Sequence, residues 1–304
     1  MKKLLPFAFV LVLAAVLVMA FPVFADMTSL LEEADGLHDA ENHMAAKELL
    51  LANLDAARSD AEKAELYWRL ARALLNHGDE MEAQGAEKNA LIALYEEGEG
   101  YADLTVELAP DSFQGYYWKS ANIGRAGQVR GVLNSLFAAK PMRGLLEKAL
   151  TLNPEHADSY YVLGQLYEQL PGFPLSFGSK DYAVSLGRKS LMLHQKELDA
   201  GIEDEVDYDY WTEMAKHLYA RDWDSDKREK EQQKKRKKQS SAEGILEESF
   251  YYEADLALQP ISDLQEAKEM LGEAIDGLSG LRKRSAEQDR DLEEARELLA
   301  EWES

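Results

Sequence analysis

The chain has 304 residues, with 34 basic side chains, 57 acidic side chains and no cysteine. Its net charge of −23 repels phosphate backbones, so nucleic-acid binding is disfavoured. Without cysteine the chain forms no disulfide and no thiolate site, and it has no cysteine for lipid attachment after its N-terminal segment.

Residues 1–25 have the pattern of a secretory signal peptide. Lys2 and Lys3 precede an apolar run that closes at Val23-Phe24-Ala25, with small residues where cleavage before Asp26 requires them. The alternative is an uncleaved membrane anchor, because the apolar run approaches the roughly 20 residues of a spanning helix. We expect cleavage, which places the mature protein in the periplasm or outside the cell with a net charge of −25.

The rest of the chain predicts an all-α protein. Apolar residues recur three and four positions apart, as on residues 86–109, and strand signals are nearly absent. Aromatic pairs recur 50, 43 and 50 residues apart, which is the scale of helical repeat arrays: Tyr67-Trp68, Tyr117-Trp118, Tyr160-Tyr161 and Tyr210-Trp211. We therefore predict an α-solenoid of irregular helical hairpins over residues 26–260, closed by a C-terminal capping hairpin over residues 261–304.

The irregular spacing predicts insertions between the helices. We expect an extra helix from Val129 to Ala139, which Pro141 separates from a helix over residues 142–152, and a turn between helices at Gly124 and Gly127. A second insertion, residues 170–178, contains too much Pro and Gly for a helix, and Ser179 suits the N-cap of the helix that follows.

The segment from residue 227 to residue 239 contains eight lysines and arginines. A dense run of like charges is usually a solvated or mobile insertion, which is the interpretation we favour. Its alternatives are contact with anionic lipids and an electrostatic tether to the acidic body of a partner.

The sequence predicts no enzyme, no cofactor and no metal site. The six histidines are scattered singly, and His38 and His43 are five residues apart, a poor helical spacing for shared metal ligation. Neither a phosphate-binding glycine loop nor a Gly-x-Ser-x-Gly nucleophile motif is present.

One anomaly predicts a binding site. From Ser112 to Leu146 there is no Asp or Glu, although five cations and several aromatic residues are present. One interpretation is simply a pair of buried central helices. The other is an inter-repeat cavity that holds a small amphipathic acid, with two phenylalanines as a lid. Its predicted ligand- or partner-binding residues are Tyr117, Trp118, Asn122, Arg125, Arg130, Lys140, Phe173 and Phe177.

One unit carries a family resemblance. Tyr160-x2-Leu163-Gly164-x2-Tyr167, preceded by Asn153-Pro154, resembles the tetratricopeptide (TPR) repeat. Together with the signal segment and the 170–178 insertion, the chain resembles the T components of tripartite ATP-independent periplasmic (TRAP) transporters over roughly residues 60–220. The central segment is also similar to the regulators of microtubule dynamics. The transporter resemblance implies an all-helical periplasmic protein, often oligomeric, that partners a substrate-binding subunit and holds a hydrophobic ligand.

These observations predict a non-catalytic helical-repeat scaffold that binds a partner protein, together with a small amphipathic acid. The alternative is a carrier of a hydrophobic small molecule. We expect the protein to form a homo-oligomer and to bind no nucleic acid.

Overall fold

The computed structural model describes residues 27–203 and 205–304, so the predicted signal segment lies outside the described residues. Every regular element of this part is a helix, which confirms the all-α prediction. The first elements are α1 Met27–Asp39, α2 His43–Ala52, η1 Leu54–Ala56, α3 Asp60–Ala83, α4 Lys88–Leu108, α5 Phe113–Arg130, α6 Val132–Leu152 and α7 Ala157–Gln169. They are followed by α8 Lys180–Asp199, α9 Asp209–Arg221, α10 Ser225–Gln239, α11 Gly244–Phe250, η2 Tyr252–Asp255, α12 Asp263–Gly280 and α13 Ala286–Glu303.

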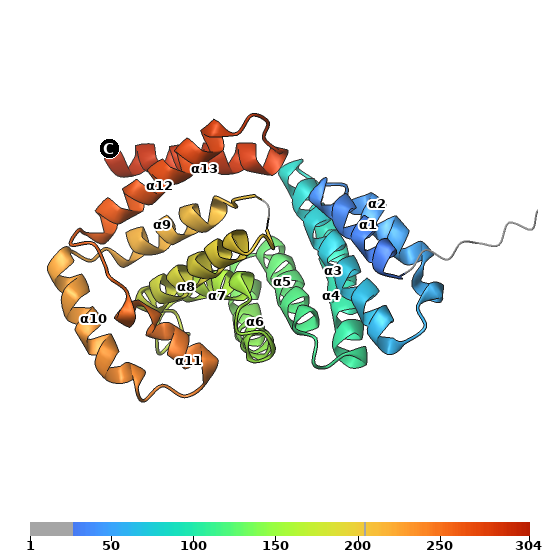
Figure 1. Ribbon diagram of the computed structural model, residues 1–304, viewed down its shortest axis with the longest axis horizontal. Coiled ribbons are helices and arrows are strands. Elements are labelled where there is room, and N and C mark those ends of the chain that lie inside the picture. Colours follow the sequence, from blue (N-terminus) through green and yellow to red (C-terminus); the bar gives the residue numbers. More distant parts are fainter. Residues whose placement is uncertain (1–26, 204) are drawn as a thin grey trace, which may run out of the picture.

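Successive helices pair into hairpins that stack side by side as an α-solenoid. The pairs α3/α4, α5/α6 and α7/α8 are consecutive in sequence, and α1 and α2 pack against the first of them. Figure 1 shows the resulting arch, with the N-terminal helices at one end and α10 and α11 at the other. Along the upper side of the arch, α12 runs towards the N-terminal helices and α13 returns in the opposite direction to the C-terminus. No described helix is both long and apolar enough to cross a membrane.

The aromatic pairs lie on the first helix of each hairpin and build the contacts between hairpins. Tyr117, Tyr160 and Tyr210 belong to one buried apolar cluster that joins α5 to α9. A Cβ on Gly164 would lie 2.6 Å from Nε2 of His217, so the small residue of the Leu-Gly pair makes room for this imidazole. The glycine therefore allows α7 and α9 to approach closely.

The expected extra helix between residues 129 and 139 is wrong. Helix α5 continues to Arg130, and α6 runs unbroken from Val132 to Leu152 with Pro141 inside it. Gly124 and Gly127 lie within α5 and not in a turn. Their lack of a side chain leaves room for Met142 and Ala138 of α6 to pack against α5. Packing along α6 thus outweighs the loss of one helical hydrogen bond at the proline.

The residues that cap the starts of helices agree better with the structure than the expected insertions do. The Ser179 hydroxyl accepts a hydrogen bond from the Tyr182 amide and caps α8, as predicted. The preceding residues, 170–178, form no helix. Ser285 and Gln288 form a complete capping box at the start of α13. Such caps depend on residues within one turn, so the sequence contains all the information they need.

The prediction of a solvated basic insertion is wrong for one face of that segment. Residues 227–239 belong to α10, whose Arg228, Gln232 and Lys235 are buried. These residues are four and three positions apart, so they share one helical face. The remaining lysines are exposed. Helix α10 therefore has one buried face, where its charged groups are paired, and one solvated face of lysines.

The fourth hairpin is split in the sequence. Helix α9 packs against α12, and of the intervening elements α11 and η2 fold back onto α8 while α10 packs on η2. Helix α13 then packs on α12 and α9. The segment from residue 222 to residue 262 is consequently an excursion between the two halves of one structural unit.

Candidate functional site

A cleft separates the N-terminal helices from the C-terminal hairpin. Its larger recess has a volume of about 690 Å³ and lies between the α1–α2 turn, α3, the α8–α9 segment and the start of α13. A smaller recess of about 250 Å³ adjoins it, between α7, α8 and the same α8–α9 segment. Glu205 and Asp207 line both recesses, which together form what we call the acidic cleft.

The lining of the cleft is strongly acidic. Three basic side chains line the larger recess, Lys283, Arg284 and Arg290, against eight acidic ones: Asp39, Glu41, Asp79, Glu80, Glu205, Asp207, Glu287 and Asp291. The smaller recess has no lysine or arginine among its lining residues, and its acidic members are Asp158, Glu197, Glu203, Glu205 and Asp207. A cationic group entering the cleft therefore meets an excess of negative charge.

Tyrosines of the hairpin cores hold several of these carboxylates in place. The Tyr95 hydroxyl donates a hydrogen bond of 2.7 Å to Asp79. Tyr210 donates to Asp158 in the smaller recess, and Tyr161 donates to Asp209 at the start of α9. The aromatic bodies are buried in the scaffold, so their hydroxyl groups fix the acidic wall with little freedom to rearrange.

Five carboxylates of this region have raised pKa values, and burial is the main cause for each, Glu287 included. Burial, followed by repulsion from Asp209, raises the pKa of Asp207 to about 7. Burial and the same neighbour raise the pKa of Asp291 to about 8. Burial also raises the pKa of Glu197 to about 7 and that of Asp209 to about 6, although the Tyr161 hydrogen bond opposes the latter shift. These raised pKa values mean that the cleft has too few basic groups near its carboxylates to stabilise their ionised forms.

The cations at the cleft do not neutralise this group. Arg125 is occupied by Asp79, with Nε 3.0 Å from Oδ2, and Arg284 pairs with Asp289 at 2.6 Å. Lys283 and Arg290 are exposed at the rim. Charges in solvent are screened, so these cations offset the cleft carboxylates, of which Glu205, Asp207 and Glu287 are themselves exposed, only weakly.

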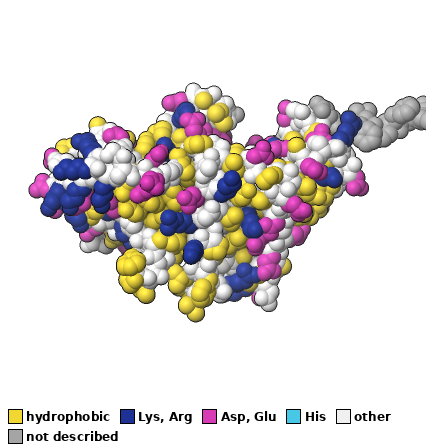
Figure 2. Space-filling view, turned by 90° about the horizontal axis from the view of Figure 1, so that it is seen from below, with side chains coloured by type: hydrophobic (Ala, Val, Ile, Leu, Met, Phe, Trp, Pro, Cys, Tyr) yellow, Lys and Arg dark blue, Asp and Glu magenta, His cyan; other side chains and the backbone are white. Residues whose placement is uncertain are grey.

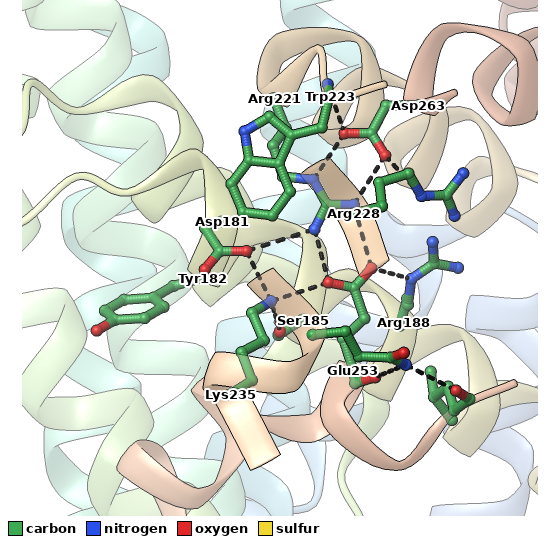
Figure 3. A network of polar contacts seen from close by, with 12 residues as sticks. Asp181, Tyr182, Ser185, Arg188, Arg221, Trp223, Arg228, Lys235, Glu253 and Asp263 are labelled. Carbon is green, nitrogen blue, oxygen red and sulfur yellow. Dashed lines mark hydrogen bonds and ion pairs between the residues drawn. The ribbon is translucent and has the colours of Figure 1, made fainter. Parts of the chain in front are cut away.

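A second concentration of charge, shown in Figure 3, is fully neutralised. We call it the ion-pair network. It joins α8, α9, α10, η2 and α12 through equal numbers of cations and carboxylates: Arg188, Arg221, Arg228 and Lys235 with Asp181, Glu253, Asp263 and Glu266. Most of these side chains are almost completely buried.

Glu253 is the centre of the ion-pair network. Its carboxylate accepts from Arg221 at 2.6 Å, Lys235 at 2.9 Å and Arg188 at 3.0 Å. Burial alone would raise the pKa of Glu253, but the positive charges of Arg221, Lys235 and Arg188 hold it well below its usual range. The network is closed and balanced, so it serves to hold the helices together.

A third polar cluster consists of Glu168, Glu213 and His217, whose ligand atoms lie within 4.8 Å of one another. His217 Nδ1 lies 2.5 Å from Glu168 Oε2, and Lys216 Nζ lies 2.5 Å from Glu213 Oε2. Both are direct contacts, shorter than the roughly 2.7–2.9 Å of a charged N–H···O hydrogen bond. A zinc ion held by bonds of about 2.0–2.2 Å would need the first two atoms further apart. At these spacings Glu168, Glu213 and His217 form a polar cluster held by direct contacts between side chains.

The residues predicted to bind a ligand do not line one cavity. Tyr117 and Asn122 are buried, and Asn122 donates to the Ala71 carbonyl at 3.3 Å, so both serve helix packing. Trp118 packs against the core with them. Arg125 pairs with Asp79 of α3 and Arg130 with Glu96 of α4.

Only Arg130 of this set lines the groove between α4, α5 and α6. This groove has a volume of about 630 Å³ and also includes Lys119 and Glu99. Lys140 is exposed, and Phe173 is 95% exposed; neither is among the residues that line the groove. Phe177 instead packs on Tyr167. The binding of an acid by these residues stays a prediction.

The sequence reasoning missed the acidic cleft. One signal was available in Asp207-Tyr208-Asp209-Tyr210, where carboxylates alternate with aromatic residues beside the fourth pair. Asp291 offered no such signal, because only the fold brings α13 towards the α8–α9 segment.

Known proteins share the fold and part of the sequence. Residues 30–169 match the family described as regulator of microtubule dynamics protein 1-3. Regulator of microtubule dynamics protein 1 of Bos taurus is 31% identical over 150 residues, which are 49% of this chain and 45% of that protein. Protein 3 of Rattus norvegicus is 25% identical over 163 residues, which are 53% of this chain and 33% of that protein. The chain thus spans less than half the length of these relatives.

A solved structure extends the likeness over nearly the whole chain. A thermophilic TPR protein of Thermus thermophilus superimposes with a TM-score of 0.53 and 15% identity, covering 91% of this chain and 98% of the other. The chain is a TPR-like helical protein. The similarity to the regulators of microtubule dynamics, which the sequence suggested, is confirmed for the N-terminal half.

Proposed function

We propose that this protein is a non-catalytic scaffold whose acidic cleft binds a cationic segment of a partner protein. The observation that carries the proposal is the excess of acidic over basic side chains that line the cleft, eight against three in the larger recess, and the raised pKa values of several of them agree with it. A lysine- or arginine-rich segment would supply the missing positive charge and favour their ionised forms.

The shape and support of the cleft favour binding over catalysis. The two recesses, of about 690 and 250 Å³, adjoin along the α8–α9 segment and offer an elongated surface. Tyrosine hydroxyl groups orient the carboxylates before any partner arrives, so little side-chain ordering is required on binding. A TPR-like fold that resembles regulator proteins fits such a role.

The finer parts of the proposal rest on the sequence. The predicted signal segment supports a location in the periplasm or outside the cell, and the resemblance to T components supports a substrate-binding subunit as the partner. We also retain the homo-oligomer and the small amphipathic acid as parts of this proposal. A carrier of a hydrophobic small molecule is the second candidate, favoured by the groove that Ile123, Leu145 and Arg130 line.

The charge recognition is tested with a fluorescein-labelled peptide of alternating lysine and alanine, measured by fluorescence anisotropy. Asp207→Asn with Asp291→Asn should weaken binding by about tenfold, because both carboxylates lie in the cleft. The matched control, Glu107→Gln with Glu303→Gln, removes the same charge at exposed positions outside it. Equal losses in both double variants would show general attraction to an acidic protein and would sink the proposal.

The natural partner is sought with a photo-crosslinking amino acid at Val206, which lines the larger recess. Expression in the native host should give a crosslinked protein that disappears when Asp207 and Asp291 are neutralised. Native mass spectrometry of the uncrosslinked protein tests the second candidate: a retained small molecule without a crosslinked protein would favour the carrier.

A further inference from the structure

A protruding apolar surface lies away from the acidic cleft. Five large hydrophobic side chains, which we call the apolar edge, are between 70% and 95% exposed: Val132, Leu133, Phe137, Phe173 and Leu175. Most other exposed large hydrophobic residues of the described chain are scattered and are exposed by about 36–43%, with Ile202 as the exception. Figure 2 shows hydrophobic side chains that project from this side of the molecule, with lysine and arginine side chains among them.

The apolar edge comes from two segments that touch where Arg143 of α6 meets Phe177 of the α7–α8 loop. Leu133, Phe137 and Pro141 are four residues apart, so they share one face of α6 that points outward. The opposite face of α6 packs against α5, with Ala138 beside Gly127. The other segment is the α7–α8 loop, which α6 contacts directly, because the Arg143 guanidinium lies 5.1 Å from the Phe177 ring centre.

The two stretches of sequence that contain the apolar edge, residues 132–146 and 170–179, together include basic residues and no acidic ones. No acidic residue occurs between Ser112 and Leu146, or in the loop from Leu170 to Ser179. Lys140 is exposed, and neither Lys140 nor Arg143 forms an ion pair within the described part of the chain. In a chain of net charge −23 this is a local reversal of sign.

We propose that the apolar edge inserts into the interfacial layer of a membrane that contains anionic lipids. These side chains protrude from the start of α6 and from a loop, and they do not line a groove that a partner could fill. The interfacial layer of a membrane is fluid, so it can accept protruding side chains without a matching surface. Lys140 and Arg143 are positioned to meet lipid phosphates while the phenylalanines enter the acyl boundary. The charge around the edge selects an anionic surface over a neutral one.

The experiment measures cosedimentation of the full chain with lipid vesicles. Vesicles of phosphatidylcholine and phosphatidylglycerol at about 2:1 are compared with vesicles of phosphatidylcholine alone. The chain should bind the anionic vesicles, and Phe137→Ser with Phe173→Ser should lower the partition coefficient by about tenfold for each phenylalanine. Ile202→Ser, at a residue that is 72% exposed and flanked by acidic positions, should leave binding unchanged.

Because the chain has no cysteine, a single cysteine gives a site-specific probe. An environment-sensitive dye on Phe173→Cys should shift its emission to the blue with anionic vesicles, and the same dye on Ile202→Cys should not. Unchanged emission at position 173, or equal binding to both kinds of vesicle, would overturn the proposal. Self-association that the double serine variant abolishes, without vesicle binding, would also overturn it and assign the edge to contact between copies.

Discussion

The ion-pair network and the acidic cleft both contain several carboxylates, but the two environments shift carboxylate pKa values in opposite directions. In the network, Glu253 and Glu266 lie among arginine and lysine, and these charges outweigh burial and lower both pKa values. In the cleft, burial acts together with like charges on Asp207 and Asp291 and raises both. The network is balanced within the described part of the chain, whereas the cleft keeps an excess of negative charge.

The largest expected effect of a substitution is at Glu253, the centre of the ion-pair network. Glu253→Gln leaves Arg188, Arg221 and Lys235 buried with a missing partner. Removal of one member of a buried ion pair costs about 3–5 kcal/mol, so we expect the free energy of unfolding in urea to fall by this amount. Glu248→Gln, at an exposed position one turn away, should change it by about 0.5 kcal/mol or less. Equal effects would show that the network contributes no more than a surface charge.

Helix α10 offers a matched pair of lysines. Lys235 is 4% exposed and bonds Glu253 and Asp181, whereas Lys237 on the same helix is exposed. Lys235→Met should cost about 2–4 kcal/mol and increase amide hydrogen exchange across α10. Lys237→Met should alter stability by about 0.5 kcal/mol at most. If both variants behaved alike, the helix would be the solvated insertion that its sequence suggests.

The cleft should respond to pH with the opposite sign to the network. The raised pKa of Asp291 means that the folded state holds a proton that the unfolded state releases, so stability falls as pH rises from about 4 to about 8. Asp291→Asn should therefore stabilise the protein by about 2 kcal/mol near pH 8, after allowance for its partial exposure, and by almost nothing near pH 4.

Glu266→Gln is the control for this pH dependence. The lowered pKa of Glu266 contributes stability that is present above the unfolded value and is lost as pH falls below it. This variant should destabilise the protein most near neutral pH and least in acid. Chemical unfolding at a series of pH values distinguishes the two carboxylates, and parallel pH profiles would contradict the assignment of opposite environments.

The smallest expected effect concerns the cationic peptide. Protonation of Asp207 and Glu197, whose pKa values are raised to about 7, should weaken binding about threefold to tenfold between about pH 8 and about pH 5.5. Anisotropy titrations at constant ionic strength measure this change. In the variant with Asp207→Asn and Asp291→Asn the dependence on pH should be smaller.

Local features of the fold could be predicted, and long-range electrostatics could not. The caps at Ser179 and Ser285 depend on residues three positions away, and the unit around Tyr160 contains its own packing signal. The burial of Arg228 depends on Asp263 and Glu266, which are distant in sequence. Without the fold, a paired arginine and a solvated one have the same sequence pattern.

The apolar edge and the acidic cleft also differ in how far the sequence alone could predict them. The acid-free stretch and the 170–178 loop were visible as composition, and they contain the residues of the apolar edge. The cleft required Asp79 from α3, Asp207 from the α8–α9 segment and Asp291 from α13 to be brought together. Their meeting depends on the path of the C-terminal hairpin, which periodicity does not specify.

The split fourth hairpin has a consequence for the order of events on the ribosome. Met214 and Leu218 of α9 bury their side chains against Ala267 and Leu271 of α12. Helices α10 and α11 must be synthesised before this contact can form. The nascent chain therefore carries an unpaired apolar face on α9 while the first three hairpins can already stack, and this face is covered only after α12 has been translated.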